Sequence, residues 1–234
     1  MFGTTASRRA RRVAGGSRAA LLAAAVLALA APALPGAAQP KTPPTREEAR
    51  RDIAKPDAEA RRQAAAWFGE IGTMADAPLL LKALKDDDEV VRALAEGSLW
   101  HVWSRSGDAQ VDALFQTGVR QMTEGAPDDA IQTFSEIIRR KPEFAEGWNK
   151  RATVYYMVGE FDKSLHDCDE VIKRNPTHWG VLSGYGQIYL ALDKPERALE
   201  YFERALAINP NLKGVEAAVV ELRKLIVEKR KGTI

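Results

Sequence analysis

The sequence predicts an all-α protein, an α-solenoid in which short helices follow one another in repeated hairpins. Three observations lead to this fold class. Prolines recur at an interval of 34 residues, at Pro142, Pro176 and Pro210. Apolar residues recur at steps of three and four, which is the spacing of one helix face. No segment of the chain reads as a β-strand.

Residues 1–38 are predicted to be a secretory signal peptide. Five arginines precede an unbroken apolar run from Ala19 to Ala31, and small residues follow at 36–38. A basic, then apolar, then small-residue order is typical of a cleavable signal, and the run is shorter than the roughly 20 apolar residues of a membrane span. We expect export, to the periplasm, with no integral span after cleavage. The alternative is an uncleaved membrane anchor, and the export route, general or twin-arginine, stays open.

The charge balance gives no reason to expect nucleic-acid binding. The chain has 34 basic and 32 acidic residues, and residues 1–38 hold five arginines and no acid, so 29 basic and 32 acidic residues remain after cleavage. A nucleic-acid-binding domain would carry a basic footprint instead. The single cysteine, Cys168, cannot form an intramolecular disulfide.

Residues 39–44 are expected to be a flexible leader, and residues 45–108 a set of packed helices. Thr45 and Glu48 form a capping-box pattern at the start of the first helix. Two helical stretches then match at an offset of 31 residues, each beginning with an aspartate suited to an N-cap, Asp57 and Asp88. This pattern resembles short HEAT-like repeats, and the resemblance implies structural roles for the aspartates and arginines.

Residues 109–212 contain three helical hairpins of 34 residues each, at 111–144, 145–178 and 179–212. Each hairpin has a small residue at its eighth and at its twentieth position. These are the positions where the two helices of a hairpin cross closely. The eighth positions are Gly118, Ala152 and Gly186, and the twenty-fourth are Phe134, Cys168 and Phe202. A 34-residue helix–turn–helix unit of this kind resembles the tetratricopeptide repeat (TPR). Because Cys168 replaces a phenylalanine, the second repeat is expected to be comparatively underfilled.

Residues 213–234 are predicted to be a capping helix and tail. Apolar residues from Val215 to Ile226 share one helix face, and charged residues cover the other. A polar outer face is what the end of a repeat array requires. A membrane-binding role for the basic residues at 229–231 is the less favoured interpretation.

No catalytic residue, metal site or cofactor is predicted. The three histidines share no metal-ligand spacing with Cys168 or with pairs of acids, and no phosphate-binding loop or nucleophile motif occurs. The acidic run at 86–89 is interpreted as a loop and first helical turn, where the helix dipole favours acids. Cys168 is expected to be a buried core thiol.

The TPR resemblance implies a partner-binding surface on the concave side of the array, which the first helix of each hairpin lines. Carried over residue by residue, the candidates are Phe115, Val119, Met122, Asn149, Thr153, Tyr156, Met157, Ser183, Gln187 and Leu190. Some family members grip acidic peptide tails with a lysine–asparagine clamp. Here no lysine takes such a position, and Asp112 and Glu146 are acidic, so that activity is not expected.

Trp100 and Trp103 are a second candidate for a binding surface. They lie three residues apart on one helix face, where the two kinds of repeat meet. The structural interpretation is a packed seam between the two segments. The functional one is an exposed aromatic anchor for a partner, since aromatic residues are common in binding hot spots.

These observations predict a non-enzymatic, exported scaffold or adaptor that binds a partner protein or peptide along its concave face. Two alternatives stay open: a cofactor-handling or lyase-like protein that acts through the HEAT-like segment, and a self-assembling structural protein. The sequence does not identify the partner or the oligomeric state.

Overall fold

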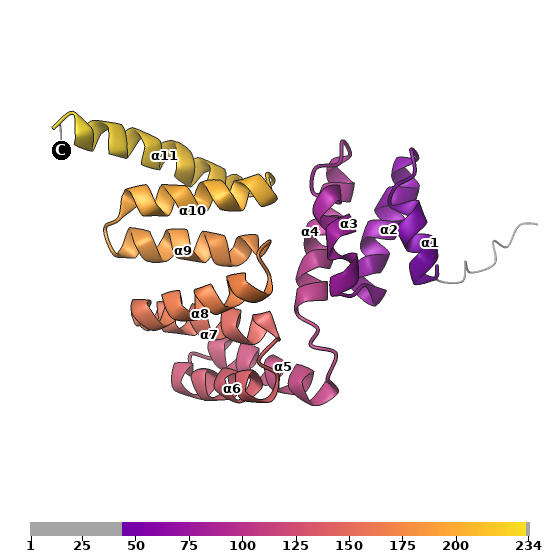
Figure 1. The fold of residues 1–234 in the computed structure, drawn as a ribbon, viewed down its shortest axis with the longest axis horizontal. Helices are drawn as coiled ribbons and strands as arrows, with labels where there is room; N and C mark the ends of the chain where they lie inside the picture. The colour runs from indigo at the N-terminus through magenta and orange to yellow at the C-terminus, as the bar shows by residue number, and fades with distance from the viewer. Residues whose placement is uncertain (1–43, 233–234) are drawn as a thin grey trace, which may run out of the picture. The chain divides into compact units, whose positions relative to one another are not determined.

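A computed structural model describes residues 44–232, and the predicted signal peptide and leader lie almost entirely outside these residues. The described part is helical, with no strand among residues 44–232. Figure 1 shows hairpins stacked in chain order from α5 to α10, with α11 on the last of them. The elements are α1 (Arg46–Asp52), α2 (Ala58–Ile71), η1 (Met74–Asp76), α3 (Ala77–Ala83), α4 (Glu89–Trp103), α5 (Ala109–Thr123), α6 (Pro127–Arg140), α7 (Ala145–Met157), α8 (Phe161–Arg174), α9 (Trp179–Ala191), α10 (Pro195–Ile208) and α11 (Lys213–Arg230).

The N-terminal helices begin with the caps that the sequence predicts. Thr45 and Glu48 form the capping box of α1. Asp57 accepts hydrogen bonds from two backbone amides at the start of α2, and Asp88 accepts one at the start of α4. Each cap satisfies helix N–H groups that have no partner within their own helix.

Ion pairs join these N-terminal helices. Arg61 Nε lies 2.8 Å from Asp86 Oδ2, and Arg62 pairs with Asp88. The carboxylate of Asp76 is fully buried, and it accepts hydrogen bonds from Arg46 Nε at 2.7 Å and Arg50 Nε at 2.8 Å. The acids of this segment are therefore held in place by arginines and backbone amides.

Acid is expected to destabilise this segment. Burial alone would raise the pKa of Asp76, but the Thr73 amide and the two arginines lower it below its ordinary value. Arg61 likewise lowers the pKa of Asp86. On acidification, the unfolded chain therefore takes up protons at a higher pH than the folded chain does. The two carboxylates stabilise the fold at pH values above their ordinary pKa of about 4, and this contribution is lost as the pH falls through their lowered pKa values. Urea unfolding between pH 7 and pH 2 should show that decline, and a smaller one in Asp76→Asn. An equal decline in both proteins would contradict the assignment.

The hairpin turns repeat in the same conformation. Gly125 and Gly159 have φ of 74° and 77°, in the left-handed region that glycine enters without steric conflict. The equivalent residue of the third hairpin is Asp193, with φ of 52°. The 34-residue period thus extends to the backbone of the turns.

The helix α4 lies beside the ends of the repeat hairpins (Figure 1) and does not pack extensively against α5, the next helix in the chain. Arg92 Nε of α4 donates to Asn211 Oδ1 at 3.0 Å, and Asn211 Nδ2 donates to the Leu84 carbonyl at 2.8 Å. Trp179 and Leu182 of α9 belong to the same buried core as α2 and α4. The segment 45–103 therefore buttresses the loops that connect the repeats.

Trp100 and Trp103 form part of this packed junction. The ring of Trp103 stacks on His178 with a centroid distance of 4.5 Å, and Trp100 meets Trp179 edge-on at 5.7 Å. Only 4% of Trp103 is exposed. A Cβ added at Gly180 would lie 2.5 Å from the Trp100 ring, so the close approach depends on that glycine. The interpretation of Trp103 as an exposed anchor is thus wrong, because α4 is covered by α9.

Candidate functional site

Each repeat hairpin pairs a small residue on its first helix with a residue of its second helix. A Cβ added at Gly118 would lie 2.7 Å from the Phe134 ring, and one added at Gly186 would lie 2.5 Å from the Phe202 ring. In the second hairpin the equivalent pair is Ala152 and Cys168, both buried. The methyl group of Ala152 stands where the other hairpins hold a phenylalanine ring, and the small cysteine accommodates it.

A pocket of about 50 Å³ lies above this small pair. Three of its residues are predicted site residues on α7, namely Asn149, Thr153 and Tyr156. The remainder come from α7, α8 and α9: Ala152, Ser164, Cys168, Val181, Gly184 and Ile188. Residues of the first helices of hairpins two and three thus meet over the side chain of Cys168.

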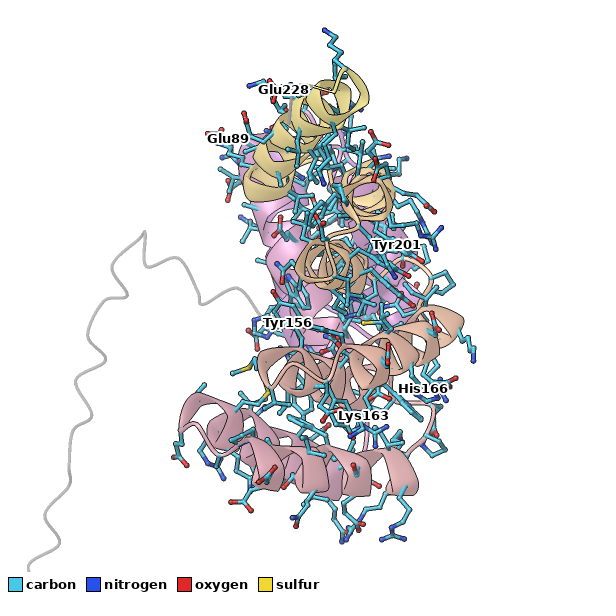
Figure 2. All side chains as sticks on the ribbon, turned by 90° about the vertical axis from the view of Figure 1, so that its left-hand side faces the viewer. Glu89, Tyr156, Lys163, His166, Tyr201 and Glu228 are labelled. Atoms are coloured by element: carbon cyan, nitrogen blue, oxygen red, sulfur yellow. The ribbon has the colours of Figure 1, made fainter. Side chains whose placement is uncertain are left out.

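The rim of this face carries exposed apolar side chains. Met157 is 59% exposed and Val158 is 43% exposed at the C-terminal end of α7, and Leu190 is 41% exposed near the end of α9. Thr153 and Gln187 are also exposed, Ser183 is half-buried, and the ring of Tyr156 lies 5.9 Å from that of Phe161. Figure 2 shows Tyr156 and His166 on opposite sides of the array, so Tyr156 belongs to the face of the first helices.

Two other predicted contact residues are buried: Phe115 has no place on the surface, whereas Asn149 still lines the pocket. Phe115 is 3% exposed because its ring packs edge-on against Phe134 and Phe144. Asn149 is 9% exposed, and its amide lies over the pocket but is hydrogen-bonded inside the array. Val119 and Met122 are half-buried and pack against the core around Phe115.

A buried polar network underlies the N-terminal ends of α7 and α9. Glu146 and His178 have no exposed surface, and Glu146 Oε1 lies 2.5 Å from His178 Nε2. Asn149 Nδ2 donates to Glu146 Oε2 at 2.9 Å. The Val181 amide donates to His178 Nδ1 at 3.2 Å, so Nε2 carries the ring proton that Glu146 accepts. The network joins two successive repeats.

Glu146 is ionised in this network. Burial alone would raise the pKa of Glu146, but His178, Lys150 and Asn149 favour the charged form and lower it below its ordinary value. The carboxylate is directed into the protein, so the acid expected from the sequence to line the groove does not face it. Asp112 is also engaged, accepting from the Ser106 amide at 2.8 Å. The face between α7 and α9 is therefore apolar and nearly neutral.

Cys168 is a core thiol and not a reactive one. It is 3% exposed, and burial together with the charges of Asp167 and Asp169 raises its pKa to about 12. A thiol reacts through its thiolate, so at neutral pH Cys168 serves to shape the pocket. Among residues 44–232, no group of three or more His, Cys, Asp and Glu side chains is placed to hold a metal ion.

A larger groove, of about 520 Å³, lies between α10 and α11. Its lining includes Glu196, Glu200 and Glu203 with apolar residues between them. Arg223 of α11 donates to Glu203 at 2.7 Å and so bridges this groove. None of the predicted concave residues lies in it, and its walls are the last hairpin and the cap.

Sequence reasoning missed Gly184, Val181 and the polar pair Glu146–His178. Gly184 could have been found, because a glycine at this position has no counterpart in the first two hairpins, where the equivalent residues are Gln116 and Lys150. A Cβ added there meets no heavy atom within 4 Å, so the glycine leaves the pocket open.

The comparisons with known proteins agree with this architecture. The tetratricopeptide repeat family matches residues 179–212. A TPR repeat-containing protein of Rhizobium etli is 33% identical over 130 residues, which are 56% of this chain and 63% of that protein. The Hsp70-Hsp90 organizing protein of Triticum aestivum is 28% identical over 100 residues, which are 41% of this chain and 17% of that protein. The chain thus spans less than two thirds of either relative.

A solved structure shows the same fold. The TPR domain of Sgt2 from Aspergillus fumigatus superposes with a TM-score of 0.51 at 18% identity, covering 54% of this chain and 85% of that domain. Among residues 44–232, no helix is long and apolar enough to cross a membrane. The sequence similarities are to tetratricopeptide repeat proteins, and the family itself matches one repeat of the chain, at residues 179–212.

Proposed function

We propose that this chain is a non-enzymatic adaptor that binds an extended segment of a partner protein across the face of α7 and α9. One observation carries the proposal: the pocket over Cys168, beside the exposed side chains of Met157 and Leu190. Exposed apolar groups around a concavity are typical of binding surfaces. Because no charge is directed into the pocket, the segment it fits is apolar.

The names of relatives are consistent with such a role. The wheat relative is named for organizing Hsp70 and Hsp90, two other proteins. In this chain the two acids at the predicted concave positions have partners within the protein, Asp112 the Ser106 amide and Glu146 the His178 ring. We therefore propose a partner segment with a small apolar side chain at its centre.

Filling the pocket from Gly184 tests the proposal. Gly184→Leu places a side chain into open space and improves helix propensity, so the fold should keep its melting temperature. Partner capture by the purified protein should fall at least tenfold, because the anchor residue of a partner loses its pocket. The matched control is Gly97→Leu, at a helical glycine of α4 that also has open space.

The outcome separates two surfaces. Capture that is lost in Gly184→Leu and kept in Gly97→Leu supports the face of α7 and α9. Capture unchanged in Gly184→Leu, with native helicity, would exclude this pocket as the site. Polypeptides that both variants retain are background.

We also propose export of the chain with cleavage between Ala38 and Gln39. The support is the order of arginines, apolar run and small residues in the first 38 residues. N-terminal sequencing of the protein from its host should begin at Gln39. A chain that still begins at Met1 would contradict cleavage and favour the membrane anchor.

A further inference from the structure

A third cavity, of about 170 Å³, lies where the N-terminal helices meet the repeats. Trp103 contributes from the end of α4, and Arg105 from the segment that follows it. Lys141 comes from the loop between α6 and α7, and Arg174 and Asn175 come from the end of α8. Lys141 and Asn175 are equivalent residues of successive repeats, 34 positions apart.

Two buried donors in the lining have no acceptor. Trp103 and Asn175 are each 4% exposed, and neither Trp103 Nε1 nor Asn175 Nδ2 has a hydrogen-bond partner among the described residues. The orientation of the Asn175 amide is fixed, since its Oδ1 accepts from the backbone and hydroxyl of Thr177 at 3.3 and 2.9 Å. Its NH₂ group is thus the free end. Buried hydrogen-bond donors are paired in most proteins, so two unpaired donors in the lining of one cavity point to a ligand that carries acceptors.

The charged groups of the lining favour an anion. It contains three cations, Arg105, Lys141 and Arg174, against one carboxylate, that of Glu143. Arg174 is also paired with Glu170, outside the lining, at 2.6 Å. Glu143 is 70% exposed and lies 3.9 Å from Lys141. Arg105 donates to the carbonyls of Gly69 and Gly72 and makes no ion pair with a described residue. No carboxylate of the described residues therefore neutralises its charge.

The apolar part of the lining restricts the kind of anion. Phe144, Ala145 and Met74 line the cavity together with Trp103. We propose that this cavity binds a small organic carboxylate with a short apolar stem. The carboxylate oxygens accept from Trp103 Nε1 and Asn175 Nδ2, the cations balance the charge, and the stem lies against the apolar wall. A bare inorganic oxyanion would satisfy the donors and leave that wall without contact.

Asn209 shows which features make the site. It is equivalent to Asn175 one repeat later, its Oδ1 accepts from Asn211, and its Nδ2 also lacks a partner. Asn209 lines neither this cavity nor the other pockets described, and no indole donor stands with it. Asn175→Asp and Asn209→Asp are therefore a matched pair. Each keeps the acceptor oxygen of its turn and replaces a donor by an acceptor.

Calorimetric titration of the protein with butyrate, acetate and inorganic phosphate, at constant ionic strength, tests the site. Butyrate should bind more tightly than acetate or phosphate, and it should raise the melting temperature because it joins α4 to the repeat loops. Asn175→Asp should weaken butyrate binding at least tenfold, and Asn209→Asp by less than twofold. Lys141→Gln should weaken butyrate binding about threefold or more. Lys173→Gln should leave butyrate binding unchanged, because the Lys173 side chain is 67% exposed.

Three results would overturn the proposal. They are no saturable binding of butyrate, an equal loss in Asn209→Asp, and phosphate binding at least as tightly as butyrate. Circular dichroism of both aspartate variants verifies that they are folded, and the lysine pair gives the same comparison without altering a turn.

Discussion

His178→Ala is expected to lower the free energy of unfolding by about 3–5 kcal/mol, the range for removing one partner of a buried pair and leaving a buried charge, here that of Glu146, without it. His178 and Glu146 have no exposed surface and approach to 2.5 Å. Without the imidazole, the Glu146 carboxylate stays buried with Asn149 as its remaining side-chain donor. The loss also removes the ring that stacks on Trp103. Chemical denaturation measures the change.

His166→Ala is the control, because its side chain is 67% exposed, and it should change stability by less than about 0.5 kcal/mol. The double variant Glu146→Ala/His178→Ala should lose less than the sum of the two single variants, since no buried charge remains unpaired. If the losses in the free energy of unfolding are additive, Glu146 and His178 do not stabilise the fold as a pair.

Gly186→Ala is expected to lower the free energy of unfolding by about 1–3 kcal/mol, the usual effect of overpacking a core. The added methyl group would lie 2.5 Å from the ring of Phe202 on α10, which is itself buried. Gly184→Ala, two residues earlier on the same helix, meets no atom and should raise stability by about 0.4–1 kcal/mol. Thermal unfolding of the two variants gives shifts of opposite sign. Shifts of the same sign would contradict the crossing of α9 and α10 at Gly186.

The repeats could be predicted because their signals are local and periodic. The spacing of Pro142, Pro176 and Pro210 marks the ends of the hairpins, and Gly118 and Gly186 mark their crossings. The underfilled second repeat was also predictable, since it follows from one substitution in a repeated position, Cys168.

The positions of individual site residues could not be predicted in the same way. Repeat register states which helix face a residue occupies, but burial depends on what covers that face. Phe115 occupies a groove position and is covered by Phe144, a loop residue. Trp103 is covered by α9, because the segment 104–108 lets α4 run beside the repeats. Such contacts join residues far apart in the sequence, and no periodicity reports them.

The resemblance of residues 45–108 to HEAT-like repeats stays a prediction. The structure gives α2 and α4 aspartate caps and arginine–aspartate pairs at the repeated positions. Their apolar faces join the core that includes Trp179. The role that this segment plays here is to pack against the repeat loops.

The most direct test of the binding face is site-specific photo-crosslinking in the native host. A photoreactive phenylalanine analogue at Thr153, which is exposed and lines the pocket, should form a crosslink to a discrete partner protein. The same group at His166, on the opposite side of the array (Figure 2), should not. Adding Gly184→Leu to the Thr153 probe should abolish the crosslink. A crosslink at His166 that matches the one at Thr153, or one at Thr153 that survives Gly184→Leu, would contradict binding at this face.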